Sequence, residues 1–374
     1  MQQRTEIPLV KRPVGRATGV TGRPRVVPHP LDFDWRFTRP TVEVIWETIG
    51  DLASPQASVA LLGTPSLAAA SRPNSIGAVT LFERNPNHYG SLSDGITFTC
   101  CDVVRDPITA AGNSVVVADP PWYEAETISF LWTAATLSKA GGHVLLSLPP
   151  VETRPGITEE RERIVAAAAG FGLTLVRLTE AVLRYRTPFF ETNATNAAGA
   201  DVPPDWRLGD LAVFLRTDVE CGVRPTMEPE PTWTERSLGL TRFKLRATTA
   251  TGFASPVLLS IVPGDILPSV SRRDPRRKDA SVWTSGNRIY RCEGTSTLTA
   301  VIDGINAGEP PEQSVGMQLG RTLTSTETDL VETVVQQVRN VVKWESVELR
   351  SSTLSGIAKL GPNRHRPTTL ERAG

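Results

Sequence analysis

A strand–turn–helix–strand sequence in the middle of the chain, residues 114–150, restricts the fold more than any other stretch: SVVVADPPWYEAETISFLWTAATLSKAGGHVLLSLPP. Its first apolar, β-branched run predicts a buried parallel strand. The spacing of the large apolar residues that follow predicts a helix, which Gly141 and Gly142 end. Residues 143–148 then predict the next strand. We therefore expect an α/β sheet with Asp119 at the carboxyl end of a strand, the edge where open α/β sheets bind ligands.

The turn itself, Asp119-Pro120-Pro121-Trp122-Tyr123, combines hydrogen-bond acceptors with aromatic faces. The two prolines fix two φ angles and remove two N–H donors, so the carboxylate and the outward carbonyls form a cluster of acceptors. Such a cluster suits an amino group, which carries N–H donors. Trp122 offers a flat face, and stacking a base on an aromatic side chain contributes about 1–3 kcal/mol. The turn therefore predicts a site for a planar amine, with Tyr123 beside the substrate.

Residues 116–122, VVADPPW, resemble the (Asp/Asn/Ser)-Pro-Pro-(Tyr/Phe/Trp) signature of S-adenosylmethionine-dependent amino methyltransferases, of which the adenine-N6 methyltransferases are the best-known members. The resemblance implies a class I methyltransferase fold with S-adenosylmethionine as cofactor. It also implies methyl transfer to an amino nitrogen, with adenine N6 in nucleic acid as the first expected substrate. Asp119, Pro120, Pro121 and Trp122 would then form the catalytic turn. The alternative interpretation is an ordinary strand-to-helix turn with a packed tryptophan.

Three further positions at the ends of predicted strands are candidates for cofactor binding. Gly63 follows the first strand, where a glycine lets a ligand approach the backbone closely and the next helix N-terminus favours an anion. Glu83 ends the second strand about twenty residues later, where nucleotide-binding α/β units place a carboxylate for the ribose hydroxyls. The resemblance places Asp102, after the third strand, near the adenine amino group of the cofactor.

Strand and helix patterns alternate from about residue 31 to residue 217. The pattern resembles the seven-strand class I methyltransferase fold, a Rossmann-like doubly wound sheet whose last strand pairs antiparallel. A smaller, mixed and β-rich domain is expected to follow. The predicted strands are residues 58–63, 78–83, 96–102, 115–118, 143–148, 173–178 and 210–216. The predicted helices include residues 41–52, with Thr41 as N-cap, and residues 157–172.

A long polar insert, residues 185–209, separates the last two of these strands. A loop of this length is usually functional or mobile. Two roles stay open for its aromatic residues Phe189, Phe190 and Trp206. Either they clamp a substrate over Trp122, with Phe190 as a substrate contact, or they anchor the insert on the sheet or on the second domain.

Composition divides the chain into four regions: a flexible basic arm (1–30), a methyltransferase-like domain (31–217), an accessory domain that begins with a linker rich in proline and acids (218–350), and a tail (351–374). The arm carries six basic residues and one acid, so it suits either phosphate contact or a solvated disordered segment.

A second basic segment, residues 271–278, lies in the accessory domain and reads SRRDPRRK. Its five basic side chains, with Trp283 close behind, suit contact with phosphates and stacking on a base. Arg272, Arg273 and Arg276 are therefore predicted substrate contacts. A solvated loop is the alternative interpretation of such a charge run.

Charge and hydropathy exclude several classes. The 40 basic and 40 acidic residues balance, so any binding to nucleic acid must rest on local patches. No apolar run approaches the roughly 18 residues of a membrane span, and the N-terminus lacks the apolar core of a signal peptide. The four cysteines have no metal-ligand spacing. We expect no metal and a cytoplasmic location, and the oligomeric state stays open.

Two other functions fit the same residues. The first turn, residues 63–66, has a single glycine, whereas that of the family is richer in glycine and often acidic. This departure favours a scaffold or binding protein with a methyltransferase-like shell that has lost the cofactor. The strand-end acids and the Asp-Pro-Pro-aromatic turn also resemble branched-polyamine aminopropyltransferases. Those enzymes carry an acidic cluster at the first turn, and here Glu124 and Glu126 are the acids that could replace it.

Overall fold

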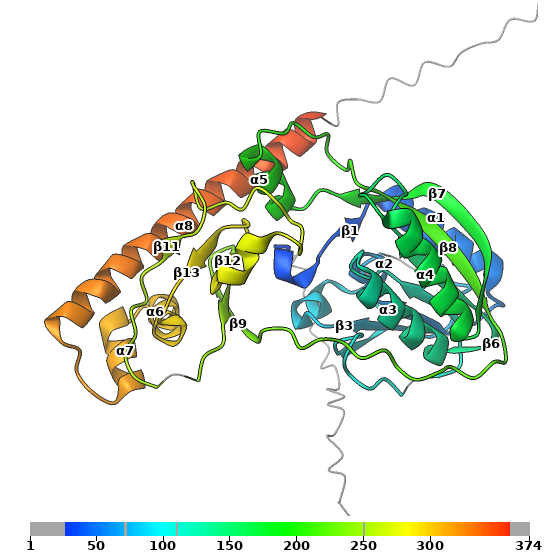
Figure 1. The fold of residues 1–374 in the computed structure, drawn as a ribbon, viewed down its shortest axis with the longest axis horizontal. Coiled ribbons are helices and arrows are strands. Elements are labelled where there is room, and N and C mark those ends of the chain that lie inside the picture. Colours follow the sequence, from blue (N-terminus) through cyan, green and yellow to red (C-terminus); the bar gives the residue numbers. More distant parts are fainter. Residues whose placement is uncertain (1–26, 71–72, 110, 250, 360–374) are drawn as a thin grey trace, which may run out of the picture. The chain divides into compact units, whose positions relative to one another are not determined.

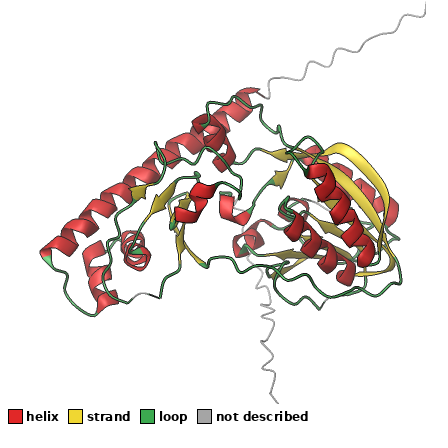
Figure 2. Cartoon of the chain, viewed as in Figure 1, coloured by secondary structure: helices red, strands yellow, loops and turns green. Residues whose placement is uncertain are grey.

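A computed structural model describes residues 27–70, 73–109, 111–249 and 251–359. Most of the predicted basic arm and the end of the predicted tail lie outside these residues. The chain forms two compact units, drawn in Figures 1 and 2. The described part of unit 1 comprises residues 36–185 and 208–228, and that of unit 2 comprises residues 27–35, 186–207 and 229–359.

Unit 1 is built on one eight-stranded sheet with the order β1-β7-β8-β6-β5-β2-β3-β4. Strands β2 to β6 are parallel to one another, and β8 pairs antiparallel with both β6 and β7. The strands are β1 (Arg36–Phe37), β2 (Val59–Leu62), β3 (Val79–Glu83), β4 (Ile96–Cys100), β5 (Asn113–Ala118), β6 (Ser138–Leu148), β7 (Leu173–Arg186) and β8 (Leu208–Arg216).

The helices of unit 1 connect these strands in the order of a doubly wound sheet, and α3 and α4 pack against each other (Figure 1). They are α1 (Arg39–Leu52), α2 (Pro65–Ala68), α3 (Glu124–Leu137) and α4 (Ile157–Gly170), with a 3₁₀ turn η2 (Pro86–Ser91). This order confirms the Rossmann-like methyltransferase fold class predicted from the sequence.

The strand order places a topological switch point between β2 and β5. The chain passes from β2 to β3 on one side and later returns to β5 on the other side. The register pairs Leu62 with Ala118, so the residues that follow, Gly63 and Asp119, leave the sheet side by side. In open α/β sheets this crevice is where ligands bind.

Some predicted boundaries were wrong. Helix α1 begins at Arg39, and its N-cap is Thr38, not Thr41. The Thr41 hydroxyl instead accepts a hydrogen bond from the N–H of Arg184 at 2.8 Å, so it joins α1 to β7. Strand β7 extends to Arg186, well beyond its predicted end, because β8 pairs with it up to Arg184.

Unit 2 contains a smaller, five-stranded antiparallel sheet with the order β11-β13-β12-β10-β9, which confirms the expected β-rich second sheet. Helices accompany it, and one of them, α5, comes from the insert that was expected to be a loop. The elements are η1 (Pro30–Asp32), α5 (Phe189–Ala197), β9 (Trp233–Leu238), β10 (Thr241–Arg246), β11 (Leu259–Ser260), η3 (Pro275–Asp279), β12 (Val282–Thr284), β13 (Ile289–Arg291), α6 (Thr295–Ala307), α7 (Pro311–Leu319) and α8 (Ser325–Lys359).

Helix α8 packs on the core of unit 2 through valines at spacings of three and four residues, the pattern of an amphipathic helix. These are Val331, Val334, Val338 and Val341, all of them buried. The helix continues well past residue 350, so much of the predicted tail is helical. Within the described ranges, every helix is too short or too polar to span a bilayer.

The segment before β1 is fixed to unit 2 by buried charges. Asp32 accepts from Arg242 at 2.6 Å and from the Lys244 ammonium, and Glu235 accepts from Arg242 at 2.7 Å. The Arg242 side chain is only 5% exposed, so its charge depends on these carboxylates for solvation. Removing one partner of such a buried pair leaves an uncompensated charge.

We predict that Asp32→Ala lowers the free energy of unfolding of unit 2 by about 3–5 kcal/mol, because Arg242 and Lys244 lose a buried counter-charge. Chemical denaturation, with fluorescence and circular dichroism as probes, measures the loss. Glu43→Ala is the matched control, since its pair with Arg39 is 54% and 84% exposed and such pairs contribute about 0–1 kcal/mol. Equal effects of the two substitutions would contradict the prediction.

Candidate active site

The backbone at the switch point requires a glycine. The N–H of Asp119 donates to the Leu62 carbonyl at 3.1 Å, which holds the ends of β5 and β2 together. Gly63 has a φ of +63°, in the left-handed region, and a Cβ there would lie 3.3 Å from the Asp119 carbonyl oxygen and 3.4 Å from the Phe130 ring. Only glycine meets both conditions without strain.

The Asp119 carboxylate accepts hydrogen bonds from two hydroxyl groups, one on β6 and one on β7. Its Oδ1 accepts from the Tyr185 hydroxyl of β7 at 2.7 Å and from the Ser147 hydroxyl of β6. Among the residues that the structure describes, no hydrogen bond reaches Oδ2. One oxygen is thus held by the protein, and the other remains as an acceptor.

Burial raises the pKa of Asp119 from its ordinary value to about 7. The bonds from Ser147 and Tyr185 act in the opposite direction, because a donated hydrogen bond stabilises the ionised form. The carboxyl group therefore titrates near neutral pH, which suits a group that accepts a proton in a reaction.

Trp122 is fixed against the same residues. Its Nε1 donates to the Ser147 hydroxyl at 3.4 Å, and its ring meets Tyr185 edge-on, with centroids 5.4 Å apart and planes at 88°. A Cβ at Gly209 would lie 2.9 Å from the indole Cζ2, so a glycine is needed there. We call Asp119, Trp122, Ser147 and Tyr185 the Asp119 cluster.

The rest of the turn agrees only in part with the sequence prediction. The Pro121 carbonyl accepts a hydrogen bond from the Tyr123 N–H at 2.7 Å. The expectation that this carbonyl faces outward as an acceptor for the substrate is therefore wrong. Pro120 is buried, and no hydrogen bond to its carbonyl is seen among the described residues. Tyr123 is half-buried below the Arg154 guanidinium, which lies 5.9 Å from its ring centroid.

The three predicted cofactor residues lie at the carboxyl ends of three adjacent strands, β2, β3 and β4. Gly63 follows β2. Glu83 ends β3 and is 9% exposed, and its Oε1 accepts from the Asn85 N–H at 2.9 Å. Asp102 follows β4, where its Oδ1 accepts from the Val104 N–H at 2.9 Å.

Ser147 and Tyr185 are the site residues that the sequence reasoning missed. Both lie near the carboxyl ends of strands parallel to β5, so they reach the same sheet edge as Asp119. The available signal was a polar residue at the end of an apolar strand, which Ser147 shows clearly. Tyr185 gave no such signal because β7 was predicted to end before it.

Phe190 is not where the substrate-clamp interpretation put it. Its side chain is fully buried in unit 2, with its ring perpendicular to Trp35 at a centroid distance of 4.9 Å. Glu191 beside it accepts from the Trp35 Nε1 at 2.9 Å and pairs with Arg207. The prediction of Phe190 as a substrate contact is thus contradicted, because the ring belongs to the core of unit 2. The structure shows the anchoring alternative for Phe189 and Phe190, which are buried, whereas Trp206 is exposed.

The basic segment 271–278 is largely engaged within unit 2. Arg272 donates to Glu230 at 2.8 Å, and Arg276 donates to both oxygens of Asp274 at 2.9 and 2.6 Å. Arg273 is exposed. The predicted substrate contacts at these arginines stay untested, and Arg272 and Arg276 already have a counter-charge.

The expected stacking role of Trp283 is wrong in this structure. The indole is 1% exposed, its Nε1 donates to Asn287 at 3.1 Å, and the Arg277 guanidinium covers it at 4.3 Å from the centroid. No face of the ring is available for a base.

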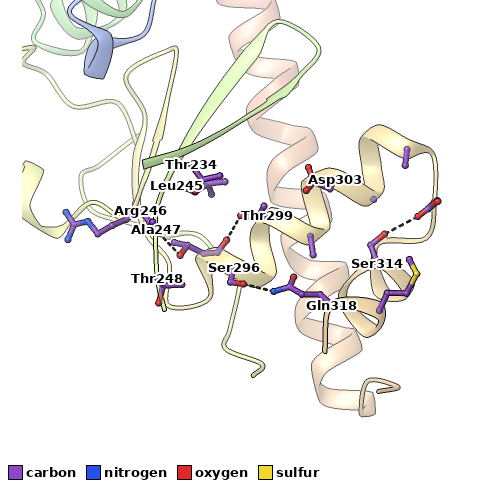
Figure 3. Close-up of a pocket in the computed structure, with 16 residues that line it drawn as sticks. Thr234, Leu245, Arg246, Ala247, Thr248, Ser296, Thr299, Asp303, Ser314 and Gln318 are labelled. Carbon is purple, nitrogen blue, oxygen red and sulfur yellow. Dashed lines mark hydrogen bonds between the residues drawn. The ribbon is translucent and has the colours of Figure 1, made fainter. Parts of the chain in front are cut away.

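Unit 2 also has a shallow polar pocket of about 560 Å³ between β10, α6 and α7 (Figure 3). None of the sequence-predicted site residues is among those that line it. Several of its polar groups bond to one another or to the backbone: Gln318 donates to Ser296 at 2.5 Å, and Thr299 donates to the Thr295 carbonyl at 2.8 Å. Arg246 points its guanidinium away from α6 and α7 (Figure 3). Two carboxylates, Asp303 and Glu309, line the pocket, and Asp303 pairs with Arg236 at 2.6 Å.

No family model and no curated protein matches the chain. Solved structures are similar to it. One is a branched-chain polyamine synthase mutein from Thermus thermophilus in complex with N4-aminopropylspermidine and 5'-methylthioadenosine, with 14% identity over 55% of this chain and 64% of that chain and a TM-score of 0.45. The chain thus spans less than two thirds of that protein.

Methyltransferases are also similar. Magnesium protoporphyrin IX methyltransferase from Synechocystis, with bound S-adenosylmethionine, has 12% identity over 47% of this chain and 78% of that one, with a TM-score of 0.32. A TehB-like S-adenosylmethionine-dependent methyltransferase from Corynebacterium glutamicum has 12% identity over 48% and 89%, with a TM-score of 0.31. The fold assignment rests on the strand order of unit 1, and these likenesses add no functional argument.

We predict that Asp119→Asn stabilises the protein at pH 8 and loses this advantage as the pH falls toward 4. The native pKa of about 7 lies above the ordinary value of 3.8, so ionisation of Asp119 opposes folding as the pH rises between these values. The gain at pH 8 is on the order of 4 kcal/mol, and denaturation at several pH values measures it.

Glu124→Gln is the control with the opposite sign. The bonds from Arg163 hold the pKa of Glu124 below its ordinary value, so its ionised form supports folding and its loss is felt at neutral pH. If Asp119→Asn and the unaltered chain had the same free energy of unfolding at every pH, the pKa of Asp119 would not be raised in the folded protein.

Proposed function

We propose that this protein is an S-adenosylmethionine-dependent methyltransferase that acts on an amino nitrogen, with the N6 amine of adenine in nucleic acid as its first expected substrate. The observation that carries the proposal is the Asp119 cluster. A carboxylate lies beside a fixed indole at the switch point of the sheet; two hydroxyls hold one of its oxygens, and no described residue bonds to the other.

The residues at the adjacent strand ends fit the cofactor. Gly63 presents backbone without a side chain where the strands part, and the Glu83 carboxylate, with about four acceptor positions, suits a pair of ribose hydroxyls. The Thr64 hydroxyl in the same turn is buried and has no hydrogen-bond partner among the described residues. When bound, S-adenosylmethionine supplies an electrophilic methyl group on a positively charged sulfur.

The protein's own contribution is to hold and orient the amine. An ionised Asp119 accepts an N–H of the amine at Oδ2, which leaves more electron density on the nitrogen. Tyr185 and Ser147 keep the carboxylate in one orientation through Oδ1, so it need not reorganise during the reaction. With a pKa of about 7, Asp119 also accepts the proton that the nitrogen loses.

The choice of adenine rests on the Asp-Pro-Pro-Trp turn and on Trp122, which offers a ring face to a planar base. A base in a duplex would have to leave the stack to reach this turn. The engaged arginines of segment 271–278 lend this choice little support, so nucleic acid is to be tested against protein and small-molecule amines.

We predict that the unaltered chain transfers labelled methyl from S-adenosylmethionine to one fraction of a cell extract separated into nucleic acid, protein and small molecules. Asp119→Ala should reduce transfer by at least about 10³-fold, since both the acceptor for the N–H and the fixed charge are lost. Mass spectrometry of digested nucleic acid identifies N6-methyladenine if adenine is the substrate.

The stability of the chain, measured with and without S-adenosylmethionine, separates the alternatives. S-adenosylmethionine at 100 times its dissociation constant should stabilise the chain, and its Asp119→Ala variant, by about 2.7 kcal/mol. Absence of stabilisation would favour a scaffold protein. Activity only with the decarboxylated cofactor and a polyamine would indicate aminopropyl transfer.

We predict that Tyr185→Phe moves the pH at which activity is half-maximal from about 7 to a higher value, by roughly one unit. The phenol bond stabilises the ionised carboxylate, and a hydrogen bond to a charged group is worth about 1.5–3 kcal/mol. Rate measurements between pH 6 and 10 test this, with activity largely restored at the high-pH plateau. A uniform loss at every pH would contradict the assigned role.

A further inference from the structure

The segment after β8, residues 217–228, was expected to be a linker but packs on unit 1. We call it the strap. Trp132 of α3 donates from Nε1 to the Gly222 carbonyl of the strap at 2.7 Å. Cys221 and Met227 pack against the hydrophobic core of unit 1. The strap therefore packs on α3 and on the core of unit 1.

Arg224 joins the strap to the turn after β4. Its Nη1 donates to the carbonyls of Arg105 at 3.1 Å and Asp106 at 2.9 Å, and its Nη2 donates to the Val103 carbonyl at 2.9 Å. The guanidinium also lies 5.3 Å from the centroid of the Trp132 ring. A planar guanidinium with several fixed donors can satisfy three carbonyls at once, whereas a lysine ammonium is a single point charge.

The turn held in this way is the one that Asp102 begins. Asp102 accepts from the Val104 N–H at Oδ1 and from Arg105 at Oδ2, the latter at 3.0 Å. Arg105 in turn donates to the Glu228 carbonyl of the strap at 3.0 Å. Asp102, the carboxylate predicted to lie near the cofactor adenine, is thus bonded to this turn. The strap, through Arg224, donates hydrogen bonds to the carbonyls of the same turn.

Helix α3 holds the other side of the same turn. The Thr133 hydroxyl donates to the Val103 carbonyl at 3.1 Å, and the Ser129 hydroxyl donates to the Val104 carbonyl at 3.3 Å. The turn is therefore fixed between α3 and Arg224. Of these two supports, only Arg224 supplies a charge.

We infer that Arg224 is a positioning residue of the cofactor site, which keeps the Asp102 turn in the conformation that receives the adenine end of S-adenosylmethionine. This inference rests on the proposed function. Loss of Arg224 removes this donor from the Arg105 and Asp106 carbonyls and leaves the Val103 carbonyl with the Thr133 hydroxyl, so the turn relaxes away from the geometry that the cofactor needs. The Asp119 cluster, which Arg224 does not contact, keeps its chemistry.

The test compares Arg224→Ala and Arg224→Lys with Arg216→Ala in the full chain. Arg216, at the end of β8, also donates to carbonyls, namely those of Ala135, Gly172, Thr217 and Val219, and to none in the Asp102 turn. Two of these carbonyls, Thr217 and Val219, belong to the start of the strap. Arg216→Ala therefore controls for loss of an arginine that bonds to the backbone and to the strap but not to the Asp102 turn.

Calorimetry with S-adenosylmethionine and hydrogen exchange of the cofactor-free protein are the two readouts. We expect Arg224→Ala to raise the Kd for S-adenosylmethionine at least tenfold. The Kd of Arg224→Lys should lie between those of Arg224→Ala and the unaltered chain, and the Kd of Arg216→Ala should stay within twofold of the unaltered chain. Exchange of the amides of residues 103–106 should accelerate in Arg224→Ala and not in Arg216→Ala. In turnover, Arg224→Lys should raise KM for the cofactor and leave kcat and its pH midpoint unchanged.

The outcomes are distinguishable. Equal Kd and exchange in the Arg224 and Arg216 variants would overturn the inference and leave the proposed function standing. Absence of binding by the unaltered chain would overturn the proposed function and the inference with it. If Arg224→Ala does not fold, Arg224→Lys decides, and an unchanged Kd and KM in that variant count against the positioning role.

Discussion

The pairing of β2 with β5 is the interaction on which the candidate site depends. It brings the ends of two strands that are far apart in sequence into register, so that Gly63 and Asp119 leave the sheet together and the Asp119 N–H reaches the Leu62 carbonyl. The close approach removes any room for a side chain at residue 63. The glycine at residue 63 is thus explained by the backbone of the Asp119 turn, whatever ligand the crevice receives.

A perturbed carboxylate alone does not identify a site in this chain. Burial also raises the pKa of Glu345 on α8 to about 7, and that side chain accepts from the hydroxyls of Thr284 and Ser285. Arg288 lies 3.6 Å from it, and a Cβ at Gly286 would clash with it at 2.4 Å. Glu345 is enclosed on every side as a structural anchor, whereas Asp119 is half-buried and keeps one oxygen unbonded among the described residues. Geometry separates the two.

The sequence predicted the features that depend on local pattern. Apolar runs marked the strands, and the acids at their ends, Glu83 and Asp119, lie at the expected edge of the sheet. Ser147 and Tyr185 could not be assigned in the same way, because their contact with Asp119 depends on the spatial order of the last strands. Phe190 was misplaced because a nine-residue helix in a polar insert shows too little periodicity to reveal which core it joins.

Saturation of one carboxylate oxygen determines what the cluster can do. With Oδ1 occupied by two hydroxyls, the protonated form of Asp119 places its proton on Oδ2 and becomes a donor there, which would repel the N–H of an amine. The ionised form presents an acceptor at the same position. The hydroxyls of Ser147 and Tyr185 favour the ionised form against the cost of burial. The apolar strands create that cost, and the two hydroxyls offset enough of it to make the carboxylate an acceptor near neutral pH.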